Sequence, residues 1–476
     1  MRNPPEVTDP KFDIFSYLSQ VKDDKIVFKN IAKAILKNFN DWESFFPKDS
    51  MNQFLDTLAA GYEGYSKDSN HEVTNYYHTI LHAADVMQTV FVFILQSGSK
   101  SIIGVDTTAE TMDKSSDRQI DLDYLTLIIA AAGHDYKHMG RDNKFYGNDS
   151  VKDYDIKPIL KEFDYQLEPY HAKMTLQLIN DVGLLKLLTD KEQERFKELI
   201  KQFIEGTNGV NNLKEGSFLK EHKDEIRSTE FEVPKDHDET KIMAMTAMLH
   251  AADISNPTKA TEIYVEWSNR VNQEFCSQHL EEISLAEKWT NYKCVNNVND
   301  FANGQKGFFK FVVNQFYPSF CEAFIDLEKL CVNIEKNKKT ISNDETLDEL
   351  ADSIRTERVT SVFAPSETCS LRGGTSILAT AAGEDNLPYS FLKVGNYNFK
   401  CIKEDEKESE EGEIITDYKC NYSGKVTKGE YYIDYAYDIF NKNKKFLVPA
   451  NTKIKLSECE EDERKIAKKN MFNEFD

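Results

Sequence analysis

The chain has 476 residues, of which 40% are hydrophobic, so it is long enough to bury a large core. Acidic residues outnumber basic residues by 81 to 59, which leaves a formal net charge of −22. This balance argues against nucleic acid as a partner, because a phosphate backbone binds to a basic surface. An anionic substrate would need local positive charge, which metal ions can supply.

The beginning of the chain, MRNPPEVTDPK, lacks the basic-then-apolar pattern of a signal peptide. The longest apolar run, around residues 90–95, is too short to span a bilayer. The cysteines are scattered without a C-x-x-C pair, so neither a zinc ribbon nor a redox motif is indicated. We therefore expect a soluble cytoplasmic protein with reduced thiols and no membrane span.

Residues 1–48 have apolar residues at helical spacing and predict a helical lead-in. The helical pattern then continues almost without a break into YYHTILHAADVMQTVFVFIL. In that stretch His78, His82 and Asp85 are four and three residues apart, so one helix would present all three on one side. A lone histidine on such a face is usually a satisfied core residue, whereas this combination favours a site.

The stretch AAGHDYKHMGRDN follows a buried apolar run, LTLIIA, and places His134, Asp135 and His138 within five residues. On a helix the two histidines would share one face. Burial of three such groups is costly unless something binds them, and a divalent metal is the simplest compensation. The alternative is a polar helix end with an exposed His–Asp pair, and this stretch alone does not decide between the two.

Later helices carry further candidate ligands. Glu168 lies on a predicted helix after the central stretch, and His250 and Asp253 lie at the end of an apolar helix that Asn256-Pro257 terminates. A buried aspartate at such a position requires a cation or hydrogen-bond donors. The stretch NGQKGFFKFVVNQF then predicts a strongly aromatic helix.

Composition changes towards the C-terminal end. Residues 346–386 are rich in Ser, Thr, Gly and Ala and are predicted to be a linker. Over 387–476, short runs such as YYIDYAYDIF and KFLVPANTKIKL predict a small strand-rich module. The sequence indicates neither a function nor a protein partner for this module.

Three separated helices thus offer H-x-x-x-H-x-x-D, H-D-x-x-H and H-x-x-D. A site of two imidazoles and two carboxylates would collect His82, His134, Asp135 and Asp253. Such a mixture of N and O ligands suits Zn²⁺, Mn²⁺ or Fe²⁺, and Asp135 could bridge to a second, harder ion such as Mg²⁺. Two adjacent metals can hold and deprotonate a bridging water for in-line attack on phosphorus.

Four stretches, YYHTILHAADV, GHDYKHMGRDNKF, LHAADISNP and GQKGFFKF, resemble in this order the class I cyclic nucleotide phosphodiesterases. The ligand skeleton is shared with the wider HD phosphohydrolase superfamily, whereas the four stretches together are specific. The resemblance covers about residues 45–335. It implies a compact all-α, multi-helix catalytic domain with an HD-type metal site, which we assign to residues 49–345.

The resemblance implies hydrolysis of 3′,5′-cyclic nucleotides to nucleoside 5′-monophosphates, which ends a signal. His78 would be the general acid that protonates the departing ribose O3′, while a metal-bridging hydroxide attacks phosphorus. The four ligands would hold Zn²⁺, with Mg²⁺ or Mn²⁺ in a second site that Asp135 bridges. His138 and Glu168 would orient metal-bound waters.

The resemblance also implies a substrate pocket. Gln305 would hydrogen-bond the purine edge, and Phe308 would stack on the base opposite an aliphatic wall that includes Val271. Tyr77 and Asn256 would line the same pocket. The motif Ser-Asn-Pro around Asn256 resembles family members that prefer cyclic AMP, although Gln305 occurs with either preference.

Several positions depart from the family pattern. Lys137 stands where an acidic residue is usual, which would weaken the network around the second metal. EGTN at residues 205–208 replaces the family's Thr-Asp-Met, so either Thr207 substitutes for the family threonine or its contact is lost. The departures motivate one alternative, a catalytically weak cyclic nucleotide binder or scaffold. The shared metal skeleton leaves a second alternative open, another HD-type nucleotide phosphohydrolase. A homodimer is left open.

Overall fold

The computed structural model describes residues 6–39, 41–62, 75–96, 118–149, 151, 156–227, 238–284, 298–324 and 327–350, together with eight strands between residues 369 and 455. From residue 6 to residue 350 the described elements are all helical, so the predicted all-α fold is confirmed. No helix in these described ranges is long and apolar enough to cross a membrane.

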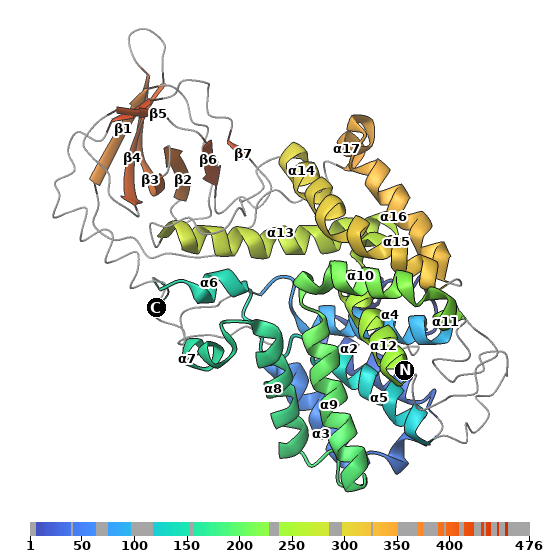
Figure 1. Ribbon diagram of the computed structural model, residues 1–476. Coiled ribbons are helices and arrows are strands. Elements are labelled where there is room, and N and C mark those ends of the chain that lie inside the picture. The colour runs from blue at the N-terminus through green and yellow to red at the C-terminus, as the bar shows by residue number, and fades with distance from the viewer. Residues whose placement is uncertain are drawn as a thin grey trace.

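The helices are α1 (Ile14–Val21), α2 (Asp24–Leu36), α3 (Lys48–Gly61), α4 (Ile80–Gln96), α5 (Arg118–Gly133), α6 (Asn143–Gly147), α7 (Lys157–Leu160), α8 (Leu167–Asp181), α9 (Asp190–Gly206), α10 (Asn212–Glu221), α11 (Lys223–Arg227), α12 (Asp238–Asp253), α13 (Thr261–Ser284), α14 (Val298–Phe308), α15 (Asn314–Ala323), α16 (Glu328–Thr340) and α17 (Asp344–Leu350). Short 3-10 turns and one π-helical segment join them: η1 (Trp42–Ser44), η2 (Lys161–Phe163), η3 (Gly209–Asn211), η5 (Asn256–Thr258) and η6 (Phe309–Val313). Figure 1 shows α13 running between the group α14–α16 and the larger group that contains α4, α5, α8 and α9.

Two almost wholly buried helices form the centre of the core. Every residue of α4 from Ile80 to Ile94 is buried, and so is every residue of α5 from Leu122 to Gly133. Helices that are hydrophobic on all sides belong inside a protein, and α2, α9 and α12 cover these two. The predicted buried helix before His134 is therefore confirmed, and its polar C-terminal end is held deep in the protein.

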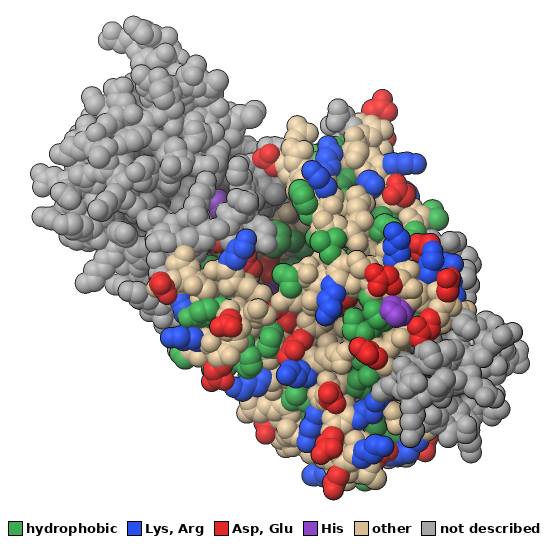
Figure 2. All heavy atoms as spheres, in the orientation of Figure 1, with side chains coloured by type: hydrophobic (Ala, Val, Ile, Leu, Met, Phe, Trp, Pro, Cys, Tyr) green, Lys and Arg blue, Asp and Glu red, His purple; other side chains and the backbone are tan. Residues whose placement is uncertain are grey.

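Helix α9 illustrates how local sequence signals define an element. Thr189 and Glu192 form a capping box, in which the Thr189 side chain accepts from the backbone of Glu192 and the Glu192 carboxylate accepts from the backbone of Thr189. Behind this cap, apolar residues recur at helical spacing and are all buried: Phe196, Leu199, Ile200, Phe203 and Ile204. On the face shown in Figure 2, basic side chains alternate with acidic ones over the helical part.

The structure joins Cys321 in α15 to Cys331 in α16 by a disulfide, with a Cα–Cα distance of 6.6 Å. The expectation of reduced thiols is therefore wrong for this pair. The spacing of ten residues does not reveal the pairing, because it depends on how the second helix folds back on the first.

The strands are β1 (Cys369–Gly374), β2 (Tyr389–Val394), β3 (Tyr397–Glu408), β4 (Ile414–Tyr422), β5 (Glu430–Tyr432), β6 (Tyr435–Asp438), β7 (Lys445–Phe446) and β8 (Lys453–Lys455). They form one antiparallel sheet in the order β5-β8-β1-β4-β3-β2-β6-β7. Strand β1 lies within the predicted linker 346–386, and α17 crosses the start of that linker. The division into domains, with a separate module over 387–476, stays a prediction.

The buried carboxylate of Asp123 links three core helices, so we expect its removal to change the stability of the protein strongly. Asp123 in α5 is fully buried and pairs with Arg195 of α9 and Lys241 of α12, at 2.8 and 3.0 Å. We expect Asp123→Ala to lower the free energy of unfolding by about 3 kcal/mol, because it leaves two partly buried cations without their partner. Urea unfolding measures this.

The matched control is Asp56→Ala, which removes an aspartate from the surface pair Lys29–Asp56 at 2.9 Å. Its carboxylate is 61% exposed, so we expect a change below about 1 kcal/mol. Equal effects of the two substitutions would show that burial does not strengthen the Asp123 pairs.

Candidate active site

The four predicted metal ligands meet where α4, α5 and α12 converge. His82 is in the first turn of α4, His134 and Asp135 directly follow α5, and Asp253 ends α12. The Nε2 atoms of His82 and His134 lie 3.0 and 3.4 Å from Asp253 Oδ1, and 3.7 and 3.1 Å from Asp135 Oδ2. One ligand atom from each residue lies within 4.8 Å of all the others, so a single ion could contact all four.

The orientation of His134 suits a cation. Its Nδ1 bonds to the Ala131 carbonyl at 2.9 Å, which makes Nδ1 the protonated nitrogen and leaves a lone pair on Nε2. That Nε2 is fully buried without a hydrogen-bond partner. Because an orphaned buried acceptor is costly, and because two carboxylates face it, the donor set fits a divalent metal.

The two carboxylates of this cluster are held in their ionised form. Burial by itself raises the pKa of Asp135, but the imidazoles around it, His134 first, outweigh burial and hold that pKa well below its usual value. For Asp253, the facing imidazoles of His134 and His82 likewise outweigh burial and lower the pKa. Ionised carboxylates are the form that binds a metal.

The local backbone differs from the predicted helices at two places. His78 precedes α4, which begins at Ile80, and Glu274 accepts the backbone N–H groups of Tyr77 and His78. The prediction that His78 and His82 share one helix is therefore wrong.

The prediction that His134 and His138 share a helix face is also wrong, because α5 ends at Gly133. The turn after it places Lys137 at φ +66°, in the left-handed region that no α-helix contains. Tertiary contacts thus place these histidines, rather than helical spacing.

His78, His138 and Glu274 form a second cluster beside the ligands. His78 Nδ1 pairs with Glu274 Oε1, and the His78 ring stacks on His138 at a centroid distance of 3.9 Å. Burial by itself lowers the pKa of His78, but the carboxylates of Glu274 and Asp135 outweigh it and raise this pKa to about 9. Sequence reasoning missed Glu274. It lies 196 positions from His78, and its only signal in the sequence is that it is an acidic residue within a helix.

Helix α8 carries His171, for which the sequence predicted no role, and Glu168, which was predicted to orient metal-bound waters. His171 of α8 donates from Nδ1 to the Tyr136 carbonyl at 2.8 Å and places Nε2 3.9 Å from Asp135 Oδ1. Glu168, one turn earlier, instead accepts from the Asn143 and Asn208 side chains, at 3.4 and 3.2 Å.

His138 stacks on His78, and its Nδ1 accepts the Gly140 backbone N–H at 2.9 Å. Burial and the neighbouring His78 hold the pKa of His138 well below its usual value, so its imidazole is neutral. A neutral ring can stack on a protonated His78 without charge repulsion.

The positions that depart from the family pattern have definite places. Thr207 donates its hydroxyl proton to the Ile204 carbonyl at 2.8 Å, within the end of α9. The neighbouring Asn208 reaches Glu168 instead. Lys137 is exposed, with its ammonium 5.6 Å from the centre of the Tyr136 ring.

The predicted substrate residues lie on η5, α13 and α14 and beside the start of α4. The Tyr77 hydroxyl accepts from Asn256 Nδ2 at 3.0 Å, and its ring lies 4.4 Å from the His82 ring. Gln305 is buried, and its Oε1 accepts from the hydroxyls of Tyr264 and Ser268, at 2.9 and 3.2 Å. Val271 and Phe308 are half-buried and pack on the main core.

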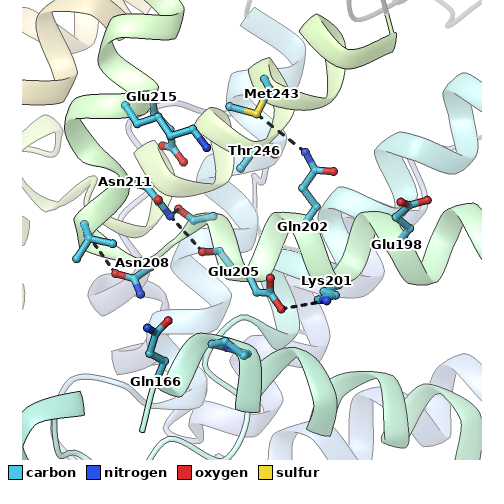
Figure 3. Close-up of a pocket in the computed structure, with 14 residues that line it drawn as sticks. Gln166, Glu198, Lys201, Gln202, Glu205, Asn208, Asn211, Glu215, Met243 and Thr246 are labelled. Carbon is cyan, nitrogen blue, oxygen red and sulfur yellow. Dashed lines mark hydrogen bonds and ion pairs between the residues drawn. The ribbon is translucent and has the colours of Figure 1, made fainter. Parts of the chain in front are cut away.

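A cavity of about 490 Å³ lies beside this site, between α8, α9, α10 and α12. Figure 3 shows its mixed lining of amides, carboxylates and Lys201. Of the residues that frame the ligand cluster, only Asn208 reaches its wall, and none of the predicted substrate residues lines it. This cavity therefore is not the predicted purine pocket.

Comparison with known proteins decides the family. The family model described as 3′5′-cyclic nucleotide phosphodiesterase matches residues 77–334, which is more than half of the chain. The chain belongs to this family. The match contains all four ligands, His78 and Gln305. Members of the family use divalent metals, in agreement with the donor set.

Named relatives are similar over part of their length. A dual specificity calcium/calmodulin-dependent 3′,5′-cyclic nucleotide phosphodiesterase 1B from Bos taurus is 28% identical over 311 residues, which are 65% of this chain and 50% of that protein. A probable 3′,5′-cyclic-AMP phosphodiesterase from Caenorhabditis elegans is 26% identical over 277 residues, 57% of this chain and 38% of that protein. The chain thus spans about half or less of these curated relatives.

A solved structure shares the fold. The phosphodiesterase domain of a RhoPDE fusion protein from the choanoflagellate Salpingoeca rosetta superimposes with a TM-score of 0.56 at 20% identity. The match covers 72% of this chain and 96% of that domain. The helical arrangement is therefore that of a phosphodiesterase domain.

If the four residues bind a metal, removal of one of them should weaken the affinity of the protein for that metal. We expect Asp253→Ala to bind Zn²⁺ or Mn²⁺ about tenfold more weakly or worse, because it removes the oxygen that faces both His82 and His134. Isothermal titration of chelator-treated protein measures the affinity. Asp181→Ala, an exposed aspartate at the end of α8, is the control, and equal affinities of the two variants would contradict the assignment.

Proposed function

We propose that the chain hydrolyses 3′,5′-cyclic nucleotides, cyclic AMP and/or cyclic GMP, to nucleoside 5′-monophosphates and thereby ends a signal. The observation that carries this proposal is the adjacency of two clusters: two imidazoles with two carboxylates, and beside them an imidazole paired with a buried glutamate. The first donor set suits a metal and the second suits a proton donor. The names of the relatives support the same substrate class.

In this proposal His82, His134, Asp135 and Asp253 hold one divalent cation, for which Zn²⁺ suits the mixed donors, and Asp135 also reaches a second, Mg²⁺ or Mn²⁺. When bound, these cations supply positive charge that attracts and polarises an anionic phosphodiester on an otherwise acidic protein. The second oxygen of Asp135 faces His171, which is neutral because burial lowers its pKa to about 4.

His78 is the proposed general acid. Glu274 occupies its Nδ1, so Nε2 is the nitrogen that can deliver a proton to the leaving ribose O3′. An alkoxide is a poor leaving group, and a positioned donor lowers the barrier to its departure. With a pKa of about 9, the imidazole carries its proton at neutral pH.

Gln305 is the proposed contact to the purine edge, with Phe308 stacked on the base opposite Val271. The side-chain amide of Gln305 is held by two hydroxyls, those of Tyr264 and Ser268. A hydroxyl can donate or accept, so either end of the amide can turn to the base. This supports a pocket that accepts both purines. The proposed preference for cyclic AMP rests on the Ser-Asn-Pro motif alone.

The deciding measurement is turnover of cyclic AMP and cyclic GMP, side by side, by protein purified without chelator and supplied with Mg²⁺ or Mn²⁺. We expect His78→Ala to lower kcat by about 10²–10⁴-fold, because it removes the proton donor, while nucleotide binding is kept. Failure of folded, metal-loaded wild-type protein to turn over either nucleotide would favour the catalytically weak binder or scaffold. Turnover of non-cyclic nucleotides alone would favour another HD-type phosphohydrolase.

The His78–Glu274 pair predicts a change in the pH profile. A general acid works only when protonated, so activity falls as pH rises through its pKa. Glu274 raises the pKa of His78, so we expect Glu274→Gln to move the alkaline limb of kcat to lower pH. Glu262→Gln, an exposed glutamate on the same helix, should leave the limb in place. An unmoved limb in Glu274→Gln would exclude this pair as the proton donor.

A further inference from the structure

The N-terminal segment reaches the back of the candidate active site. Asp13 is the N-cap of helix α1, and its side chain accepts the backbone N–H groups of Phe15 and Ser16 at 3.0 Å. Phe15, the second residue of α1, lies with its ring centre 4.8 Å from that of Trp267 in α13. The segment lies outside the family match of residues 77–334.

Trp267 connects this contact to the ligands. It is fully buried, and its ring lies edge-on to Tyr77 at 5.6 Å and to the metal ligand His82 at 5.7 Å. Its indole Nε1 has no hydrogen-bond partner among the described residues. Because no hydrogen bond of Nε1 orients the indole among the described residues, packing against neighbouring groups holds it against His82.

One further contact holds the Phe15 ring, and two hydrogen bonds hold the segment before it. The Arg270 guanidinium lies 5.1 Å from the Phe15 ring centre and 5.7 Å from that of Trp267, so one cation covers both rings. Gln88 of α4 donates to the carbonyls of Val7 and Asp9, both at 3.1 Å. The N-terminal segment is thus attached to the same helix that carries His82.

We propose that Phe15 is a positioning residue for the metal cluster and acts through Trp267. Its ring presses the indole against Tyr77 and His82 and so sets the angle at which His82 faces Asp253, 3.0 Å away. Without Phe15 the indole can tilt into the vacated volume, and His82 loses the surface that orients it. The inference rests on the proposed function and extends its machinery to a segment before the family match.

The test compares Phe15→Ala with Phe12→Ala. Phe12 lies just before α1, but its ring packs on Tyr17, 5.9 Å away. Trp42→Phe and Trp289→Phe leave Trp267 as the sole tryptophan, since the chain has three. In that background we expect Phe15→Ala to shift the Trp267 emission to longer wavelength in folded, chelator-treated protein, and Phe12→Ala to leave it unchanged.

Kinetics and metal titration complete the test. We expect Phe15→Ala to lower kcat about tenfold with KM changed by less than about twofold, since a misplaced ligand affects turnover more than nucleotide contacts. Zn²⁺ affinity should fall with it, and Phe15→Tyr should restore emission, affinity and kcat. If Phe15→Ala does not fold, Phe15→Leu carries the same comparison.

The outcomes separate the two proposals. Wild-type protein without turnover would remove the proposed function, while emission and Zn²⁺ affinity would still report on Phe15. Unchanged emission and Zn²⁺ affinity in folded Phe15→Ala would overturn the positioning role. Equal losses in Phe12→Ala would also overturn it, because they would show a general effect of loosening the N-terminal segment.

Discussion

Two imidazoles and two carboxylates lie in a nearly buried space where α4, α5 and α12 meet. The rest of the structure depends on how the free-energy cost of burying these groups is offset. Charged groups cannot remain in such a place without partners. His134 is oriented by the carbonyl of Ala131, and both carboxylates keep depressed pKa values because imidazoles face them. The remaining coordinating capacity of these atoms fits a divalent cation, and such a cation would connect the fold to the proposed phosphodiester chemistry.

The groups around this cluster give neighbouring histidines different protonation states. His78 is held protonated by the buried carboxylate of Glu274, whereas His138, stacked on it, is neutral because burial and His78 lower its pKa. His171 is neutral for the same reason of burial. Similar residues a few ångströms apart thus suit different tasks: one holds a proton, and the others shape the surroundings of the ligands.

The departures from the family pattern have physical consequences that their position in the sequence does not reveal. Lys137 replaces an acidic residue, but its left-handed backbone directs it to the surface over Tyr136. The hydroxyl of Thr207 is committed to the end of its own helix, and Asn208 provides the bond to Glu168.

The sequence by itself determined the all-α fold and the two central buried helices, because apolar runs are local properties of the chain, and its His/Asp motifs singled out the four candidate ligands. It did not determine that His78 and His138 lie outside helices, that Glu274 pairs with His78, or that Phe15 reaches Trp267. Only the tertiary structure decided these, because each depends on residues far apart in sequence. The disulfide between Cys321 and Cys331 was decided in the same way, by the packing of one helix against another.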